Sequence, residues 1–307
     1  MGIDTWYILG AGNMGVLAGS YLAASGLRTR YLVPGAAGTR ERTLVFGRDR
    51  RRQRVRLQCL DPHRLEGAVG RLLLATKAGQ TAPAMAPLAG RLDGSVEIVR
   101  LQNGMGSLEP VPLPRAARVI QAVTTSGGWR RGNEHHIVAE NATLLGDGGA
   151  FPPDWFATLQ PHWPGLEWRL DIRHQQLLKL SVNAVINPLT AVFDCANGEL
   201  RERPDLLPLV EVVAREVDEV LARVDPRWPG NTMDRCLEVA RATATNTSSM
   251  RSDVRAGRAT EVDYINGWII RKAESLGLEV RENRRLLQAV RERHPPGRGG
   301  FATGAAR

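Results

Sequence analysis

Three absences limit what this chain can be. Its 307 residues include only three cysteines, Cys59, Cys195 and Cys236, which are scattered and lack the spacing of metal-ligand pairs. This usage is typical of reduced thiols in a cytoplasm, and it predicts neither disulfides nor a metal site. No apolar run approaches the roughly 20 residues that cross a bilayer, and no signal-type apolar segment precedes the first expected strand. We therefore expect a cytoplasmic protein with no metal and no membrane partner.

Charge, by contrast, is plentiful and mostly positive. The net charge is +9 with pI ≈ 10.3, and six arginines lie within residues 48–56. Such an excess suits nucleic acid, an anionic membrane surface, or an anionic cofactor and substrate, and composition alone does not separate these. However, the 48–56 run has no interleaved aromatics for base stacking and no accompanying recognition motif. We expect a solvated, cation-rich loop there and no nucleic-acid partner.

The order of apolar patterns predicts two domains. In the first part of the chain, short apolar runs alternate with turns and one helix pattern, which predicts an α/β, Rossmann-type parallel-sheet domain over residues 1–172. The expected strands are 6–9, 30–33, 72–75, 96–101 and 119–124, with a helix at 16–24. Helical patterns then follow one another and predict an all-helical domain over 173–294, with helices at 174–193, 205–224, 232–247, 262–276 and 285–293. We expect the Pro/Gly/Ala-rich residues 295–307 to be disordered.

A glycine motif follows the first expected strand. The segment Gly10-Ala-Gly-Asn-Met-Gly15 also opens a helix, the context that a dinucleotide site requires. Gly10 would allow the tight turn, Gly12 the approach of a pyrophosphate, and Gly15 close packing of helix on strand. Lys77 and Asn103 follow two further strands, at the sheet edge where open α/β sheets bind ligands. An ordinary turn is the alternative at Asn103.

Residues 5–40 contain no carboxylate at all. An NAD site expects an Asp or Glu about 20 residues after the motif, to bind the ribose hydroxyls. Here arginines are available for a 2′-phosphate instead, which favours NADP (NADPH): Arg28, Arg30, Arg40 and Arg42.

An apolar helix pattern at 177–189 carries Lys179, Asn183 and Asn187 at four-residue steps. Residues four apart share one face of a helix, so one amine and two amides form a polar stripe. A solvated surface edge is the alternative. We favour a site for a small, oxygen-rich substrate, because lysine is rarely buried without a role and the helix has no other polar face.

Further polar segments stand at 197–200, 246–250 and 260–267. Together with the glycine motif, Gln-Asn-Gly-Met-Gly at 102–106 and the striped helix, they resemble the ketopantoate reductase (2-dehydropantoate 2-reductase) family, in order from residue 6 to about 290. The resemblance implies NADPH-dependent reduction of 2-dehydropantoate to pantoate, on the route to pantothenate and coenzyme A. The resemblance also implies a small-molecule substrate, and we expect a monomer or homodimer.

The resemblance implies catalytic roles for Lys179 and Glu261. The implied substrate-binding residues are Asn103, Lys179, Asn183, Asn187, Asn197, Asn246 and Ser249. Those implied for the cofactor are Gly10, Ala11, Gly12, Asn13, Met14, Gly15, Lys77, Asn103, Gly127 and Glu261.

One departure concerns the 2′-phosphate. The family often has an arginine at the end of the second strand, and the matching place here is near Pro34. Either a neighbour such as Arg40 or Arg42 takes over, or the cofactor preference is relaxed. Two other functions stay open: a reductase of another short 2-oxo acid, and a non-catalytic dinucleotide sensor, against which Lys179 and Glu261 argue.

Overall fold

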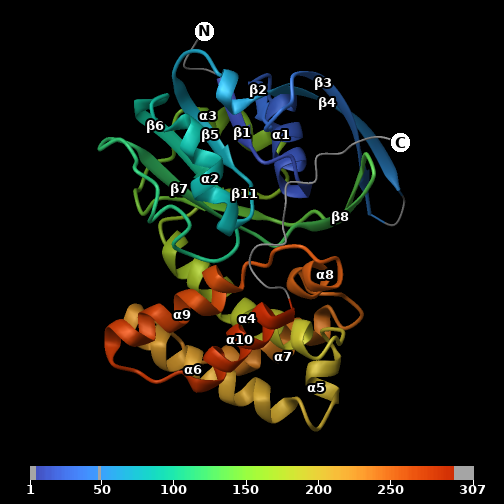
Figure 1. Cartoon of the computed structure of the whole chain (residues 1–307), viewed down its shortest axis with the longest axis vertical. Coiled ribbons are helices and arrows are strands. Elements are labelled where there is room, and N and C mark those ends of the chain that lie inside the picture. The colour runs from blue at the N-terminus through green and yellow to red at the C-terminus, as the bar shows by residue number, and fades with distance from the viewer. Residues whose placement is uncertain (1–4, 48–49, 294–307) are drawn as a thin grey trace. The chain divides into compact units, whose positions relative to one another are not determined.

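The computed structural model describes residues 5–47 and 50–293 (Figure 1). The chain divides into two compact units, one of Met1–Gln102 and Leu108–Gln176 and one of Asn103–Ser107 and Leu177–Arg307. This division differs in two respects from the expected one after residue 172. The final change of unit comes after Gln176, and the five residues Asn103–Ser107 group with the second unit. Residues 295–307, expected to form a tail, lie outside the described residues.

A sheet of eleven strands, counted over the described residues, forms the centre of the first unit. Its order is β11-β10-β7-β6-β5-β1-β2-β4-β3-β9-β8. Six neighbouring strands, from β7 to β4 in this order, are parallel, which confirms the Rossmann-type prediction. Five of the six overlap an expected strand: β1 (Thr5–Leu9), β2 (Arg28–Leu32), β5 (Val69–Leu74), β6 (Leu92–Arg100) and β7 (Arg118–Thr124).

The prediction of a loop at 48–56 is wrong from Arg51 onward. Those residues belong to β4 (Arg51–Leu60), which pairs antiparallel with β3 (Gly38–Phe46). Successive side chains of a strand point to opposite faces, so Val55, Leu57 and Cys59 alternate with the exposed residues Arg54, Arg56 and Gln58. The alternation of apolar and polar residues was not recognised in the sequence because arginines dominate this segment. The sheet is completed by β8 (Gly127–Arg131), β9 (Glu134–Ala139), β10 (Thr143–Gly146) and β11 (Leu166–Trp168).

Buried side chains cover both faces of the sheet around its central strand β1. Helix α1 (Asn13–Ala24) begins three residues before the expected start and packs Val16 and Leu17 against Trp6 and Ile8 of β1. The alternate β1 residues Tyr7 and Leu9 join a second cluster on the other face. A strand buried on both faces reads as a continuous apolar run, as β1 does. Two short helices, α2 (Thr81–Met85) and α3 (Trp155–Leu159), complete the α-helices described in this unit.

The described residues of the second unit contain helices and no strand, as expected. Helix α4 (Ile172–Val192) leads into it, and its residues Leu177, Leu180 and Ala184 pack in one core with Val217 and Trp268. The other helices are α5 (Glu199–Glu202), α6 (Leu207–Val224), α7 (Thr232–Ala242), α8 (Ser249–Arg255), α9 (Val262–Leu276) and α10 (Arg281–Arg293). No helix in the described part of the chain is long and apolar enough to span a membrane.

Two expectations for this unit need correction. The helix expected to reach residue 247 ends at Ala242, and the short helices α5 and α8 were not expected. The segment after Ala242 is rich in Thr, Asn and Ser, whose side chains compete for backbone hydrogen bonds and favour caps over helix interiors. Ser248 caps α8 in this way, because its hydroxyl accepts a hydrogen bond from the backbone N–H of Arg251.

Candidate active site

In the first unit, the glycine motif forms the turn between β1 and α1. Gly10 has φ +111°, and a Cβ on Gly15 would lie 1.9 Å from the carbonyl oxygen of Gly10, so both positions require glycine. A Cβ on Gly12 would meet nothing within 4 Å. Gly12 is the N-cap of α1, which has no side-chain cap. Open space beside uncapped helix N–H groups fits a pyrophosphate.

The side chain of Asn13, within this motif, is held on both sides. Its amide nitrogen donates to the carbonyl of Gly128 (2.7 Å), and its Oδ1 lies 2.9 Å from Nδ1 of His135. His135 is fully buried. Burial, and then the charges of Arg130 and Arg42, lower its pKa to about 4, so the ring is neutral near pH 7. Since Asn13 Oδ1 accepts, Nδ1 of His135 carries the proton. Sequence reasoning missed this contact, which links residues 122 positions apart.

The other expected cofactor residues of this unit lie near strand ends. Lys77 is half-buried after β5, and Gly127 is the first residue of β8. Ala11 and Met14 pack partly buried against the core. Gln102, which was not predicted, donates from Nε2 to the carbonyl of Thr76 (2.8 Å) and so joins the ends of β6 and β5.

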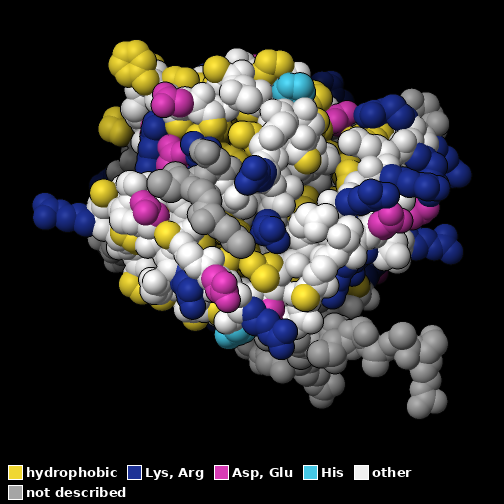
Figure 2. All heavy atoms as spheres, turned by 90° about the horizontal axis from the view of Figure 1, so that it is seen from above, with side chains coloured by type: hydrophobic (Ala, Val, Ile, Leu, Met, Phe, Trp, Pro, Cys, Tyr) yellow, Lys and Arg dark blue, Asp and Glu magenta, His cyan; other side chains and the backbone are white. Residues whose placement is uncertain are grey.

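Two of the candidate arginines lie on β3 of the β3–β4 hairpin. Arg40 and Arg42 are two residues apart on β3 and therefore share a face. Nη1 of Arg42 donates to Oδ1 of Asn133 (3.1 Å), whereas its Nε is buried without a hydrogen-bond partner in the described structure. Burial, and then the charges of Arg130 and Arg40, lower the pKa of Arg42. Figure 2 shows dark blue Lys and Arg side chains gathered on the side where Figure 1 shows β3 and β4.

In the second unit, a chain of hydrogen bonds joins three expected site residues. Nζ of Lys179 donates to Oδ1 of Asn103 (2.7 Å), and Nδ2 of Asn103 donates to Oε2 of Glu261 (3.1 Å). All three side chains are half-buried. The Asn103 amide thus lies between an ammonium and a carboxylate, and each partner fixes one end of it.

Local backbone structure explains how Asn103 reaches this place. Gly104 has φ +71°, and a Cβ there would lie 2.5 Å from the carbonyl oxygen of Tyr264. The next residue, Met105, donates its N–H to that same oxygen (2.8 Å). Glu261 is the N-cap of α9. The first turn of α9 therefore positions Glu261 and also docks the segment that carries Asn103.

The polar stripe lies on a continuous helix. Lys179, Asn183 and Asn187 all fall within α4, so the expected helix and its shared face are confirmed. Lys179 and Asn183 are half-buried, and Asn187 is 7% exposed. The binding roles of these residues stay predictions.

The last three expected substrate residues lie on two adjoining segments. The backbone N–H of Asn197 donates to the carbonyl of Asn246 (3.1 Å), and its Nδ2 donates to Oγ1 of Thr243 (2.9 Å). Oδ1 of Asn197 is buried and has no partner among the described residues. Asn246 and Ser249 are exposed. An unpaired buried oxygen beside two exposed polar residues fits a small polar ligand.

The expected residues therefore fall into two groups. The glycine motif, Lys77 and Gly127 belong to the first unit, whereas Glu261 and the whole substrate set, including Asn103, belong to the second. Within the described residues, no group of His, Cys, Asp and Glu side chains gathers in a way that could hold a metal ion.

The sequence matches two models of one protein family and is similar to curated members of it. Residues 6–149 match the family model described as Ketopantoate reductase PanE/ApbA, and residues 171–294 match Ketopantoate reductase PanE/ApbA C terminal. The chain is 36% identical over 226 residues to a 2-dehydropantoate 2-reductase from Shigella flexneri, covering 72% of this chain and 73% of that one.

Solved structures share the fold. A dimeric ketopantoate reductase from Staphylococcus aureus superposes with a TM-score of 0.82 at 19% identity, covering 94% of this chain and 98% of the other. A D-mandelate dehydrogenase, solved with NADH and anilino(oxo)acetate, superposes with a TM-score of 0.80 at 21% identity and the same coverage. The two matched models span most of the sequence and the curated relative exceeds one third identity, so this chain belongs to the ketopantoate reductase family.

Proposed function

We propose that this protein reduces 2-dehydropantoate to pantoate with NADPH, in the synthesis of pantothenate and coenzyme A. The observation that carries the proposal is the hydrogen-bonded chain of Lys179, Asn103 and Glu261. It offers one proton donor, one amide and one carboxylate in a half-buried setting. The same unit supplies further amides for an oxygen-rich substrate.

Reduction of a ketone leaves negative charge on its oxygen, which has to be stabilised and protonated. An ammonium has three N–H donors, so Lys179 can keep its bond to Asn103 and still donate to the substrate oxygen. It then acts as electrostatic catalyst and general acid. Glu261 can accept a hydrogen bond from the substrate hydroxyl, and through Asn103 it helps to orient Lys179. Asn183 and Asn187 bind the substrate without adding charge.

The first unit fits a dinucleotide. Gly10 and Gly15 allow the turn and the start of α1 to pack closely against neighbouring backbone. Gly12 leaves room for a pyrophosphate, and the first turn of α1 offers uncapped N–H groups to it. Lys77 and Gly127 would complete the cofactor contacts. The cofactor, when bound, supplies the hydride.

We assign the 2′-phosphate of NADPH to Arg40 and Arg42. Both lie near Cys59, whose pKa their charges lower against the effect of burial. Cys59 pairs with Tyr31 of β2, so these arginines stand beside the end of that strand. There they would substitute for the arginine that the family often has near the position of Pro34. A dianion would also relieve the mutual repulsion of Arg40, Arg42 and Arg130. Arg28 and Arg30 lie nearer the start of β2.

Steady-state kinetics with a panel of oxo acids test the proposal. We expect kcat/KM to be highest for 2-dehydropantoate and higher with NADPH than with NADH. A preference for an aryl-substituted oxo acid would indicate a reductase of another 2-oxo acid on the same fold. Tight NADPH binding without turnover of any oxo acid would indicate a sensor. Either result would overturn the proposal.

A further inference from the structure

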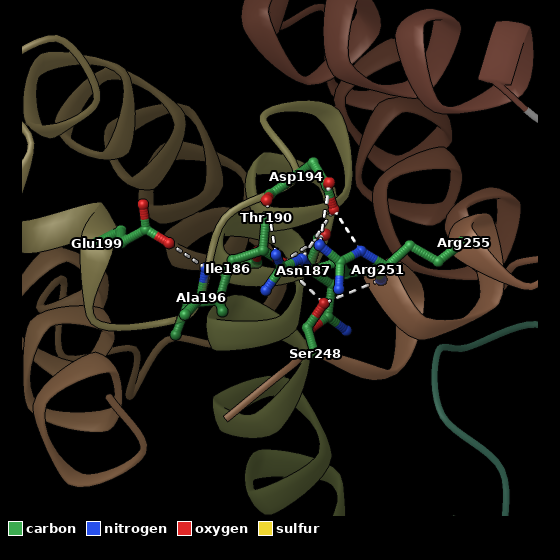
Figure 3. Close-up of polar contacts among 9 residues, drawn as sticks. All are labelled: Ile186, Asn187, Thr190, Asp194, Ala196, Glu199, Ser248, Arg251 and Arg255. Carbon is green, nitrogen blue, oxygen red and sulfur yellow. Dashed lines mark hydrogen bonds and ion pairs between the residues drawn. The ribbon is translucent and has the colours of Figure 1, made fainter. Parts of the chain in front are cut away.

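A cluster of polar contacts joins the end of α4 to the start of α8 (Figure 3). Thr190, Ser248 and Arg251 are buried in it, whereas the side chains of Asp194 and Arg255 are exposed. The hydroxyl oxygens of Thr190 and Ser248 share a hydrogen bond of 2.7 Å, and both side chains are buried. Thr190 lies one turn after Asn187 on α4, and Ser248 directly precedes Ser249. The cluster therefore adjoins two residues with proposed roles in binding substrate.

A second connection in this cluster runs through Asp194. Its Oδ1 accepts hydrogen bonds from Nε of Arg251 (3.0 Å) and Nε of Arg255 (2.7 Å), and its Oδ2 accepts from Nη2 of Arg255 (3.0 Å). Its backbone carbonyl accepts from Nη2 of Arg251 (2.6 Å). Figure 3 shows both guanidinium groups directed toward Asp194. One residue thus binds two arginines that stand one turn apart on α8.

The backbone conformation of Asp194 makes this arrangement specific. Its φ is +49°, in the left-handed region that residues other than Gly, Asn and Asp rarely adopt. This turn directs the carboxylate and the carbonyl of one residue toward the same arginine. The side chain of Arg251 is only 10% exposed, so its charge is largely removed from water and depends on these partners.

We propose that Asp194 is a positioning residue. It holds the start of α8 in place, so that the side chains of Ser249 and Asn246 keep the positions relative to Asn187 and Asn197 that substrate binding requires. The inference rests on the proposed function of those four residues. Asp194 acts through Arg251 and Arg255 rather than by touching substrate. With the bonds between residues 197 and 246, the segment that leads into α8 is held at three points.

The substitution Asp194→Asn tests the proposal, because Asn tolerates a left-handed backbone but removes the charge. Loss of an exposed ion pair weakens a local equilibrium by roughly two- to fivefold. We therefore expect KM for 2-dehydropantoate to rise by that factor, with kcat and the NADPH dissociation constant unchanged. Hydrogen–deuterium exchange of residues 246–255 should quicken in the same variant.

Asp205→Asn is the matched control. Asp205 binds Arg203 through both carboxylate oxygens on the surface of the same unit, and we expect this variant to keep the wild-type KM and exchange rates. Arg255→Gln leaves Arg251 paired with Asp194 and should show a smaller effect than Asp194→Asn.

The exchange measurement separates this inference from the proposed function. Wild-type protein that fails to reduce 2-dehydropantoate refutes the proposed function, whereas exchange still reports whether Asp194 holds α8. Unchanged exchange at 246–255 in Asp194→Asn overturns the inference. So does faster exchange with an unchanged KM, or a loss of protection spread over the whole unit together with weaker NADPH binding.

Discussion

At the scale of single residues, Lys179 carries the chemistry. Its ammonium is bound to Asn103, and Lys179→Ala would remove the proposed acid without disturbing the apolar positions of α4. We expect kcat to fall by on the order of 10²-fold or more, while the protein still folds and binds NADPH. Stopped-flow or steady-state rates with 2-dehydropantoate measure this. Near-normal turnover would remove Lys179 from the catalytic role.

Cofactor choice also depends on single residues. We expect Arg42→Gln to lower the ratio of kcat/KM for NADPH to that for NADH by roughly tenfold, the loss of about one charge-assisted contact. Arg40→Gln should act in the same direction. Arg54→Gln is the control, because Arg54 is exposed on the opposite face of the hairpin. Equal ratios in all three variants would show that other residues bind the 2′-phosphate.

At the scale of elements, the glycines in the turn from β1 to α1 have different roles: we expect Gly15 to be needed for stability and Gly12 for cofactor binding. We expect Gly12→Ala to keep the melting temperature, because a Cβ there meets open space, but to weaken NADPH binding. Gly15→Ala puts a Cβ against the Gly10 carbonyl, and overpacking of this kind costs about 1–3 kcal/mol. Calorimetry and NADPH fluorescence on the two variants measure the contrast. Equal melting temperatures in both variants, or unweakened NADPH binding by Gly12→Ala, would contradict it.

The elements that sequence predicts well are those with a clear period. The parallel strands are continuous apolar runs and α4 has a four-residue stripe, so both were recognisable from the sequence. β4 was not, because its exposed face is nearly all arginine and resembles a solvated loop. α8 is only seven residues long and follows a Thr/Ser-rich segment, so its periodicity is too short to detect.

The candidate site divides in the same way. The residues that carry its chemistry were chosen from local motifs and a family resemblance, and the structure joins Lys179, Asn103 and Glu261 by hydrogen bonds. The residues that hold them in place were missed. His135, Thr190 and Asp194 act through partners 57 to 122 positions away, and no local pattern marks such contacts.

At the scale of the whole molecule, buried His135 couples stability to pH. Its pKa in the folded protein is about 4, against 6.5 for an ordinary histidine. Between these values the unfolded chain binds a proton that the folded protein does not. The contribution of neutral His135 to the free energy of unfolding is therefore fully present above pH 6.5 and is lost as the pH falls toward 4. One such proton changes the unfolding free energy by up to about 1.4 kcal/mol per pH unit.

Urea unfolding between pH 7.5 and 4.5 measures this effect. His135→Leu removes the titrating group, so its unfolding free energy should depend less steeply on pH than that of the wild type, although Asn13 loses a partner. His162→Gln, at an exposed position, should follow the wild type. Parallel curves for His135→Leu and the wild type would show that His135 does not carry the dependence.

The grouping of Asn103–Ser107 with the second unit has a consequence for modularity. The chain changes unit three times, after residues 102, 107 and 176, so neither unit is one continuous stretch of the gene. A chimaera spliced once near residue 176 would pair the Lys179 and Glu261 of one parent with the Asn103 of the other. Recombination between relatives must therefore transfer the pentapeptide together with the helical half, or else select for compatible sequences in two separated places.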